Sequence, residues 1–563
     1  MGAVFGQDAR GRALPLYVWT GICVAWLIVV WAWSALHLAM TVDDTYYYFK
    51  TAFHVSRGVG STFDGINPTD GYHPLWLVML AGVFKLLSGD FVLLTRVAFT
   101  LQIIMIWLGG VFLARLKDAG GPKILWPLAL VLVNPFAAKI VLCGQETALQ
   151  FMLSAAALVT WWSMRQSPDG GSPKKWALLG LLCSGVALAR LDSAFFCAAL
   201  LAMPVVLPSE QERAAGLVAR FKMSVIAGIV FGAGLTVFLV IHFMSFHHLM
   251  PVSGAIKAHL DASEVAPMWK RLAAVSLAIA AIAWIWRAAK MRPAPVFALL
   301  APPIAGACIV GMYNFGLRGE MSPQLVRIWY LEPYMLVAVL AIGAMLARPL
   351  PRLAKQVLGV VIGLWFGGCV FSWRYRLNEH SYSLYEAAMR CSAWVEAHDV
   401  GEVGAAWDAG FAGAFTHKSV MNLDGLISSW EYKTYLDRGA VDEFVTSKHR
   451  IDFVIQYAWP RTLSAIAKRF EHEAVPAQPI PQTSVSGSHD RDGMSNRWGI
   501  DLTPFYVAHV ECVPVSVATN PTKVVDAVFY FVLTREPRFG HTTLAEFARA
   551  NKDRDTCDGF VSP

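Results

Sequence analysis

Long apolar runs separated by short polar connections dominate the first two-thirds of the chain. Runs of about 20 apolar residues are long enough to cross a bilayer as helices. A shorter apolar run over 74–87 begins at a proline, and it predicts a helix that lies on the membrane surface or dips into it. The pattern predicts an α-helical polytopic membrane protein of about eleven transmembrane helices, over 16–38, 92–114, 124–142, 146–164, 176–190, 193–207, 222–246, 271–288, 294–313, 325–347 and 354–373.

The composition supports this prediction. The chain has 563 residues, of which 56% are hydrophobic and 15% are charged. An ordinary soluble domain carries roughly 25% charged residues. The composition excludes a single soluble globule, a disordered chain and a nucleic-acid-binding protein with a basic stripe. The lipid bilayer is therefore the first predicted partner, and no nucleic acid is expected.

The distribution of basic residues predicts the topology. Five predicted loops carry three Lys or Arg residues each, and the positive-inside rule places such loops in the cytoplasm. This assignment requires that 74–87 does not span, that the N-terminus is cytoplasmic, and that the loops 39–91 and 247–270 and the tail are outside. The five basic loops are 115–123, 165–175, 208–222, 287–293 and 348–355.

The tail differs from the membrane body in charge and pattern. The overall charge of +7 divides into +13 before residue 376 and −6 from there on. We therefore predict a transmembrane domain over 1–375 and an extracytoplasmic α/β domain over 376–563, because 402–457 alternates β-like and helical runs. Asp408 and Asp424 follow predicted strands, and turn capping is favoured for them over a role near the membrane site.

Two adjacent carboxylates, Asp43 and Asp44, directly follow the first predicted span. Neighbouring carboxylates at a membrane surface repel each other and lose hydration, so their presence indicates a function. One could act as general base on an acceptor hydroxyl while the other orients it or binds a cation. The loop 58–76 that follows is dense in Gly, Asn-Pro and Asp-Gly turns, which is typical of an ordered functional loop. The structural alternative is a solvated cap for a helix over 45–56.

These residues carry a resemblance to a known family. The acidic pair, the pattern Tyr-Tyr-x-Phe-x-x-Ala over 46–52 and the segment Tyr-His-Pro-Leu-Trp over 72–76 resemble the GT-C superfamily of integral-membrane glycosyltransferases. The chain looks most like GT-39-type enzymes and mycobacterial terminal arabinofuranosyltransferases. The resemblance implies a polyprenyl-phosphate-linked sugar donor, inversion at the sugar carbon, and Asp43 or Asp44 as base. Likeness to the mannosyltransferase branch slightly favours Asp43, whereas the arabinosyl branch favours Asp44.

The resemblance also implies further site residues. A donor-phosphate contact is expected in the second large outer loop, where Lys257 is the available cation, and Arg327 or Arg318 would hold the lipid phosphate as a fork. The structural alternatives are a snorkelling Lys257, a helix cap at Glu146, an ion pair between Arg190 and Asp192, and a packed His73. The predicted substrate-binding residues are Tyr47, Tyr72, His73, Glu146, Arg190, Asp192 and Tyr330.

Together these features predict an inverting glycosyltransferase at the outer face of a bacterial cytoplasmic membrane. It would move an arabinofuranosyl- or mannosyl-type sugar to a hydroxyl of a glycan, lipid or protein acceptor in cell-envelope glycan or glycoprotein synthesis. The sequence contains no Walker A motif and no GxGxxG after a strand, so it shows no nucleotide-binding fingerprint, and no cofactor is assigned with certainty. Some branches of the GT-C superfamily bind a divalent cation through such an acidic motif, so the two adjacent carboxylates leave open whether this chain uses one. The alternative is a transporter or flippase for lipid-linked sugars, which predicts a repeat between halves of the chain.

Overall fold

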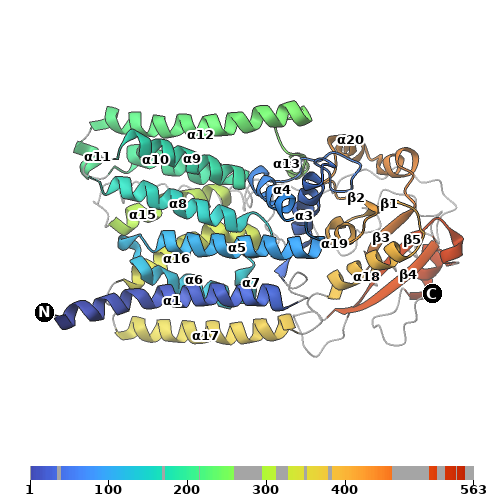
Figure 1. Cartoon of the computed structure of the whole chain (residues 1–563), viewed down its shortest axis with the longest axis horizontal. Coiled ribbons are helices and arrows are strands. Elements are labelled where there is room, and N and C mark those ends of the chain that lie inside the picture. The colour runs from blue at the N-terminus through green and yellow to red at the C-terminus, as the bar shows by residue number, and fades with distance from the viewer. Residues whose placement is uncertain are drawn as a thin grey trace, which may run out of the picture.

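A computed structural model gives the arrangement of the chain. The helices of the body run side by side along the long axis of the molecule, and a β-sheet lies at the end opposite the N-terminus (Figure 1). The described residues from 383 onward form the tail. The structure describes residues 2–33, 40–167, 171–208, 210–214, 216–258, 295–311, 328–347, 352–377, 383–458, 506–515, 526–540 and 542–551.

The body is built from helices that mostly follow the predicted spans. Within the described residues, three segments are long and apolar enough to cross a membrane: 13–32, α5 and α12. The predicted span 271–288 lies outside the described residues, so eleven spans remain a prediction. The long helices are α1 (Gly2–Ala32), α5 (Phe91–Leu113), α8 (Thr147–Arg165), α9 (Pro173–Ala189), α10 (Ala194–Val206), α12 (Gly216–Phe246), α15 (Pro295–Gly311), α16 (Glu332–Leu346) and α17 (Arg352–Leu377).

One predicted span is interrupted. Instead of a single helix over 124–142, the chain forms α6 (Leu125–Val133) and the short α7 (Pro135–Ala138). The break lies at Asn134, whose Oδ1 accepts the backbone N–H groups of Phe136 and Ala137 at 3.0 and 3.3 Å. Asn134 is therefore the N-cap of a new helix with proline at its first position. The prediction of one continuous helix was wrong here because the Asn-Pro pair favours a helix start.

Three shorter helices lie between the body and the sheet: α3 (Asp43–Ser56), α4 (Pro74–Leu87) and α13 (Val252–Ala258) (Figure 1). The predicted short helix over 74–87 is present with the predicted bounds. The loop between α3 and α4 is ordered by Asp64, whose Oδ1 accepts the N–H groups of Ile66 and Asn67 at 2.9 and 2.7 Å. Such Asx turns hold a loop in one path.

The tail contains a five-stranded mixed sheet in the order β2-β1-β3-β5-β4. Strand β1 is parallel to β2, with Ala406 paired to Asn422, and it is also parallel to β3. Strand β5 is antiparallel to both of its neighbours, β3 and β4. The segments that follow β1 and β2 therefore leave the sheet at the same end, which faces α3. The elements are α18 (Ser383–Ala397), β1 (Val403–Ala406), α19 (Ala409–Ala414), β2 (Ser419–Asn422), α20 (Trp430–Arg438), β3 (Phe453–Ala458), β4 (Tyr506–Val515), β5 (Asp526–Thr534) and α23 (Leu544–Asn551).

The tail packs on the body through a shared apolar core. One cluster of buried side chains includes Tyr46 and Phe49 of α3 together with Phe411 of α19. The ring centroids of Tyr46 and Phe411 lie 4.6 Å apart. On β3, Ile455 belongs to this cluster and its neighbour Val454 to a second cluster, because successive strand residues point to opposite faces. The body and the near face of the sheet thus form one packed unit.

Candidate active site

Asp43 joins the start of α3 to the start of α19. Its Oδ2 accepts the backbone N–H of Gly410 at 2.9 Å, and its Oδ1 accepts that of Phe411 at 2.8 Å. Burial, followed by the charge of Asp408, raises the pKa of Asp43 well above its usual range, while the two amide bonds act in the opposite direction. Both oxygens of Asp43 therefore fasten the body to the tail.

Asp44, the next residue, lies half-buried at the same junction. Its charge acts on Asp43 and on Asp424 of the tail, and Asp408 acts on both of those groups. Four carboxylates from two distant parts of the chain thus share one electrostatic environment. No group of three or more His, Cys, Asp or Glu side chains among the described residues is arranged to hold a metal ion.

Tyr47 contacts the turn that follows β2. Its hydroxyl donates to Asp424 Oδ2 at 2.9 Å and accepts from Asn422 Nδ2 at 2.8 Å. Asp424 Oδ1 accepts the N–H of Leu426 at 2.7 Å. Burial and then Asp408 raise the pKa of Asp424 to about 7. The predicted turn capping by Asp424 is present, yet its second oxygen reaches α3.

The carboxylates around Asp43 form a first polar cluster, and a second one surrounds Arg190. The Arg190 guanidinium contacts Glu146 Oε1 at 3.0 Å and Asp192 Oδ1 at 2.9 Å, and it lies 4.5 Å from the ring centroid of Tyr330. Arg190 is 4% exposed. Glu146 precedes α8 but its side chain makes no cap hydrogen bond. The capping alternative for Glu146 was wrong because the carboxylate pairs with the buried cation instead.

His73 completes this cluster at the start of α4. Its Nδ1 lies 3.4 Å from the backbone N of Leu191, which donates to it, and its Nε2 lies 3.8 Å from Glu146 Oε1. A neutral ring that accepts at Nδ1 carries its hydrogen on Nε2, facing the carboxylate. The backbone N–H of His73 donates to the hydroxyl of Tyr48 at 3.2 Å. Since Tyr47 and Tyr48 are adjacent on α3, this helix connects the two clusters.

The remaining predicted site residues lie elsewhere. The Tyr72 hydroxyl is 2.5 Å from Ser61 Oγ, which itself donates to the carbonyl of Thr69 at 2.7 Å, so Tyr72 stabilises the loop. A substrate contact for Tyr72 remains a prediction. The backbone of Lys257 belongs to α13, but its side chain lies outside the described residues, as do Arg318 and Arg327 in full. The donor-phosphate contacts therefore also remain predictions.

Two polar residues at this junction were not anticipated. Lys50 of α3 is 7% exposed, and its Nζ donates to the carbonyl of Thr416 in the tail at 2.8 Å. Asp70, in the loop before α4, is 1% exposed. A lysine directly after the aromatic run 46–49 of α3 was a usable signal for Lys50. Asp70 offered no signal beyond its Asp-Gly turn.

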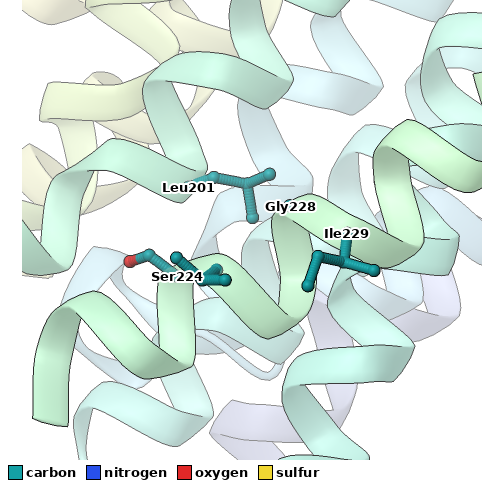
Figure 2. A pocket seen from close by; sticks show the side chains of 5 residues that line it. Leu201, Ser224, Gly228 and Ile229 are labelled. Carbon is teal, nitrogen blue, oxygen red and sulfur yellow. The ribbon is translucent and has the colours of Figure 1, made fainter.

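A separate pocket lies between α10 and α12 (Figure 2). It is lined by small and apolar side chains and contains no ionisable group. None of the residues of the two polar clusters lines it, so the chemistry of the site does not lie there. Its lining residues are Leu201, Ser224, Val225, Gly228 and Ile229.

Comparisons with known proteins give weak structural likenesses. No family model matches the chain, and no curated protein matches it. The chain is similar to archaeal oligosaccharyltransferase AglB from Archaeoglobus fulgidus in complex with an inhibitory peptide and a dolichol-phosphate, with 12% identity and a TM-score of 0.45 over 79% of this chain and 69% of that one. It is also similar to the Archaeoglobus fulgidus oligosaccharyltransferase in the apo form, with 13% identity and a TM-score of 0.46 over 80% and 70%. Likenesses this weak leave the activity to be argued from the residues of the chain itself.

Proposed function

We propose that this chain is an inverting glycosyltransferase that uses a polyprenyl-phosphate-linked sugar, with Asp44 as the general base and Asp43 as a positioning residue. The observation that carries the proposal is that both Asp43 oxygens accept hydrogen bonds, from the backbone N–H groups of Gly410 and Phe411. This arrangement fixes the adjacent Asp44 at the meeting point of α3 and the tail. Helix α3 is thereby held as a rigid support for one carboxylate beside a polar junction.

The reaction follows from that placement. Asp44 takes the proton of an acceptor hydroxyl as its oxygen attacks the anomeric carbon of the donor sugar. The new bond forms on the face opposite the lipid phosphate, so the configuration inverts. The bond between the anomeric carbon and the phosphate oxygen breaks, and the lipid phosphate leaves with the electron pair. Lys257, Arg327 and Arg318 are the cations proposed to stabilise the phosphate charge that develops.

The cluster around Arg190 is the proposed contact for the donor sugar. Its most accessible member is His73, whose side chain is 27% exposed, whereas the side chain of Glu146 beneath it is 3% exposed. An imidazole and a carboxylate that lie together can accept from and donate to sugar hydroxyls. Arg190 balances the carboxylate charge and holds Glu146 in place. Hydroxyl recognition by His73 would thus be supported by a fixed buried network.

The sugar is proposed to be of arabinofuranosyl or mannosyl type, and the acceptor a hydroxyl of an envelope glycan, lipid or protein. The proposed location is the outer face of a bacterial cytoplasmic membrane, with the tail outside. Three long apolar segments in the described residues support a membrane location. The basic loops of the sequence support the orientation.

The proposal is tested with full-length protein purified in detergent and a panel of polyprenyl-phosphate sugars. Wild type should transfer one of these sugars to an acceptor hydroxyl with inversion, and Asp44→Asn should lose the transfer. Asp90→Asn is the matched control, because Asp90 is an exposed N-cap of α5 and asparagine caps a helix equally well. The same protein is also reconstituted in vesicles, where movement of a lipid-linked sugar across the bilayer without any transfer would contradict the proposal and favour a transporter.

A further inference from the structure

Asp70 joins three separate parts of the chain. Its Oδ1 accepts the backbone N–H of Val252, the first residue of α13, at 2.9 Å. Its Oδ2 accepts the indole N–H of Trp430, the first residue of α20, at 2.9 Å. Asp70 itself lies in the loop before α4 and is 1% exposed. A carboxyl group this buried needs hydrogen-bond partners, and these two donors supply them.

His242, near the end of α12, lies beside this carboxylate. Its Nε2 lies 3.0 Å from Asp70 Oδ2, and the residue is 6% exposed. Its Nδ1 lies 2.7 Å from the carbonyl oxygen of His248. A carbonyl oxygen can only accept, so Nδ1 carries the hydrogen of its contact with His248. The approach of Nε2 to Asp70 is close but has no hydrogen-bond geometry. Asp70 and His242 therefore lie together and contact the chain at both ends of the turn between α12 and α13.

His248 and Trp430 also hold the turn between α12 and α13. The ring of His248 stacks on Trp430, with centroids 3.6 Å apart and planes 12° apart. Since Trp430 also donates to Asp70, the contacts among Asp70, His242, His248 and Trp430 form a closed ring. His247 in this turn has a φ of 60°, in the left-handed region that residues other than glycine rarely adopt. Such a conformation persists where the surroundings fix it.

We propose that Asp70 and His242 are positioning residues that fix α13, and with it Lys257, at the donor end of the site. This inference rests on the proposed function, in which Lys257 contacts the donor phosphate. Neither residue needs to touch the substrate, because Asp70 acts through the backbone of α13 and His242 through the turn before it. Loss of the pair should therefore weaken donor binding and leave the chemical step at Asp44 intact.

The kinetic test compares Asp70→Asn and His242→Gln with the control His247→Asn. His247 is exposed, and asparagine tolerates its left-handed backbone. The first two variants should raise the donor KM about tenfold with kcat within about twofold of wild type, and the control should change neither. A fall in kcat at unchanged donor KM would overturn the proposal, as would wild-type kinetics in both variants.

Hydrogen exchange in the same full-length proteins separates this proposal from the proposed function. Peptides covering 248–258 should exchange faster in Asp70→Asn and His242→Gln than in wild type or His247→Asn. Trp430→Phe is a milder variant that keeps a ring against His248 and removes only the indole N–H, and it should show a smaller increase. Unchanged exchange in all three variants would overturn the claim that Asp70 and His242 fix α13.

Faster exchange with unchanged donor KM would overturn the claim that fixing α13 serves donor binding. A wild type that transfers no sugar would contradict the proposed function, while the exchange result would still decide whether Asp70 and His242 fix α13.

Discussion

The hydroxyl of Tyr47 donates to Asp424 at 2.9 Å, although 377 positions separate the two residues in the chain. Asn422 donates to the same hydroxyl at 2.8 Å. This contact brings a tail carboxylate to the helix that carries Asp43 and Asp44. The candidate site is therefore divided between the body and the tail, and substitutions on either side should affect it.

Asp424 should make stability depend on pH. Its pKa is raised to about 7 from an ordinary value of 3.8, mainly by burial. Between these two values the folded state binds a proton that the unfolded state has lost, so the free energy of unfolding falls as pH rises through this window. Asp424→Asn should remove that part of the pH dependence, measured as thermal unfolding from about pH 4 to pH 8. An identical pH profile for wild type and variant would contradict the assignment.

Gly410 should not tolerate a side chain. A Cβ added there would lie 2.1 Å from the carbonyl oxygen of Asp43 and 2.7 Å from its Cγ. Gly410→Ala should separate α19 from α3 and destabilise the protein by about 1–3 kcal/mol, with a loss of sugar transfer. Gly82→Ala is the control, because nothing lies within 4 Å of a Cβ at that position in α4. Thermal unfolding and transfer rates that are equal in the two variants would contradict the contact between Asp43 and α19.

Lys50 should give the opposite pH dependence at alkaline pH. Burial lowers its pKa to about 8 from 10.5. Between these values the unfolded state binds a proton that the folded state does not, so the free energy of unfolding rises with pH. Lys50→Met should lack this rise, whereas Lys85→Gln, at an exposed position of α4, should keep it. The check is the difference in melting temperature between wild type and each variant across this window, and a constant difference for Lys50→Met would refute the prediction.

Removal of Arg190 should be costly because it leaves Glu146 and Asp192 without their cation. Arg190→Met should destabilise the protein by about 3–5 kcal/mol. In a double-mutant cycle, Glu146→Gln combined with Arg190→Met should cost less than the sum of the two single changes, by about 0.5–3 kcal/mol. Arg57→Met, at an exposed position, should stay within about 0.5 kcal/mol of wild type. Additive single and double variants would show that the buried pair is not coupled.

Local features of the fold could be predicted from the sequence. The predicted helix 146–164 is observed as Thr147–Arg165, and the predicted strand over 451–457 as Phe453–Ala458. Hydrophobic periodicity and length carry this information because they depend on neighbouring residues. The pair formed by Arg190 and Asp192 was also accessible, since its members are two positions apart.

The long-range contacts of the site could not be predicted in the same way. Asp43 binds amides 367 and 368 positions away, and amide donors leave no mark in the sequence because every non-proline residue has one. The acidic pair stands out in the sequence, but the proposed division of roles within it rests on contacts with the tail that only the fold supplies. Asp70 stayed hidden because an Asp-Gly pair is typical of turns, and only the folded chain brings His242 to it.

The most direct test of the proposed mechanism is the rate of sugar transfer from a polyprenyl-phosphate donor by Asp44→Asn, beside wild type, Asp43→Asn and Asp90→Asn. We expect Asp44→Asn to lose at least about 100-fold in kcat while it folds and binds the donor as wild type does. Asp43→Asn should lose both activity and stability, because an amide nitrogen cannot accept the second backbone N–H, and Asp90→Asn should match wild type. Wild-type turnover by a folded Asp44→Asn variant would contradict the assignment of the base.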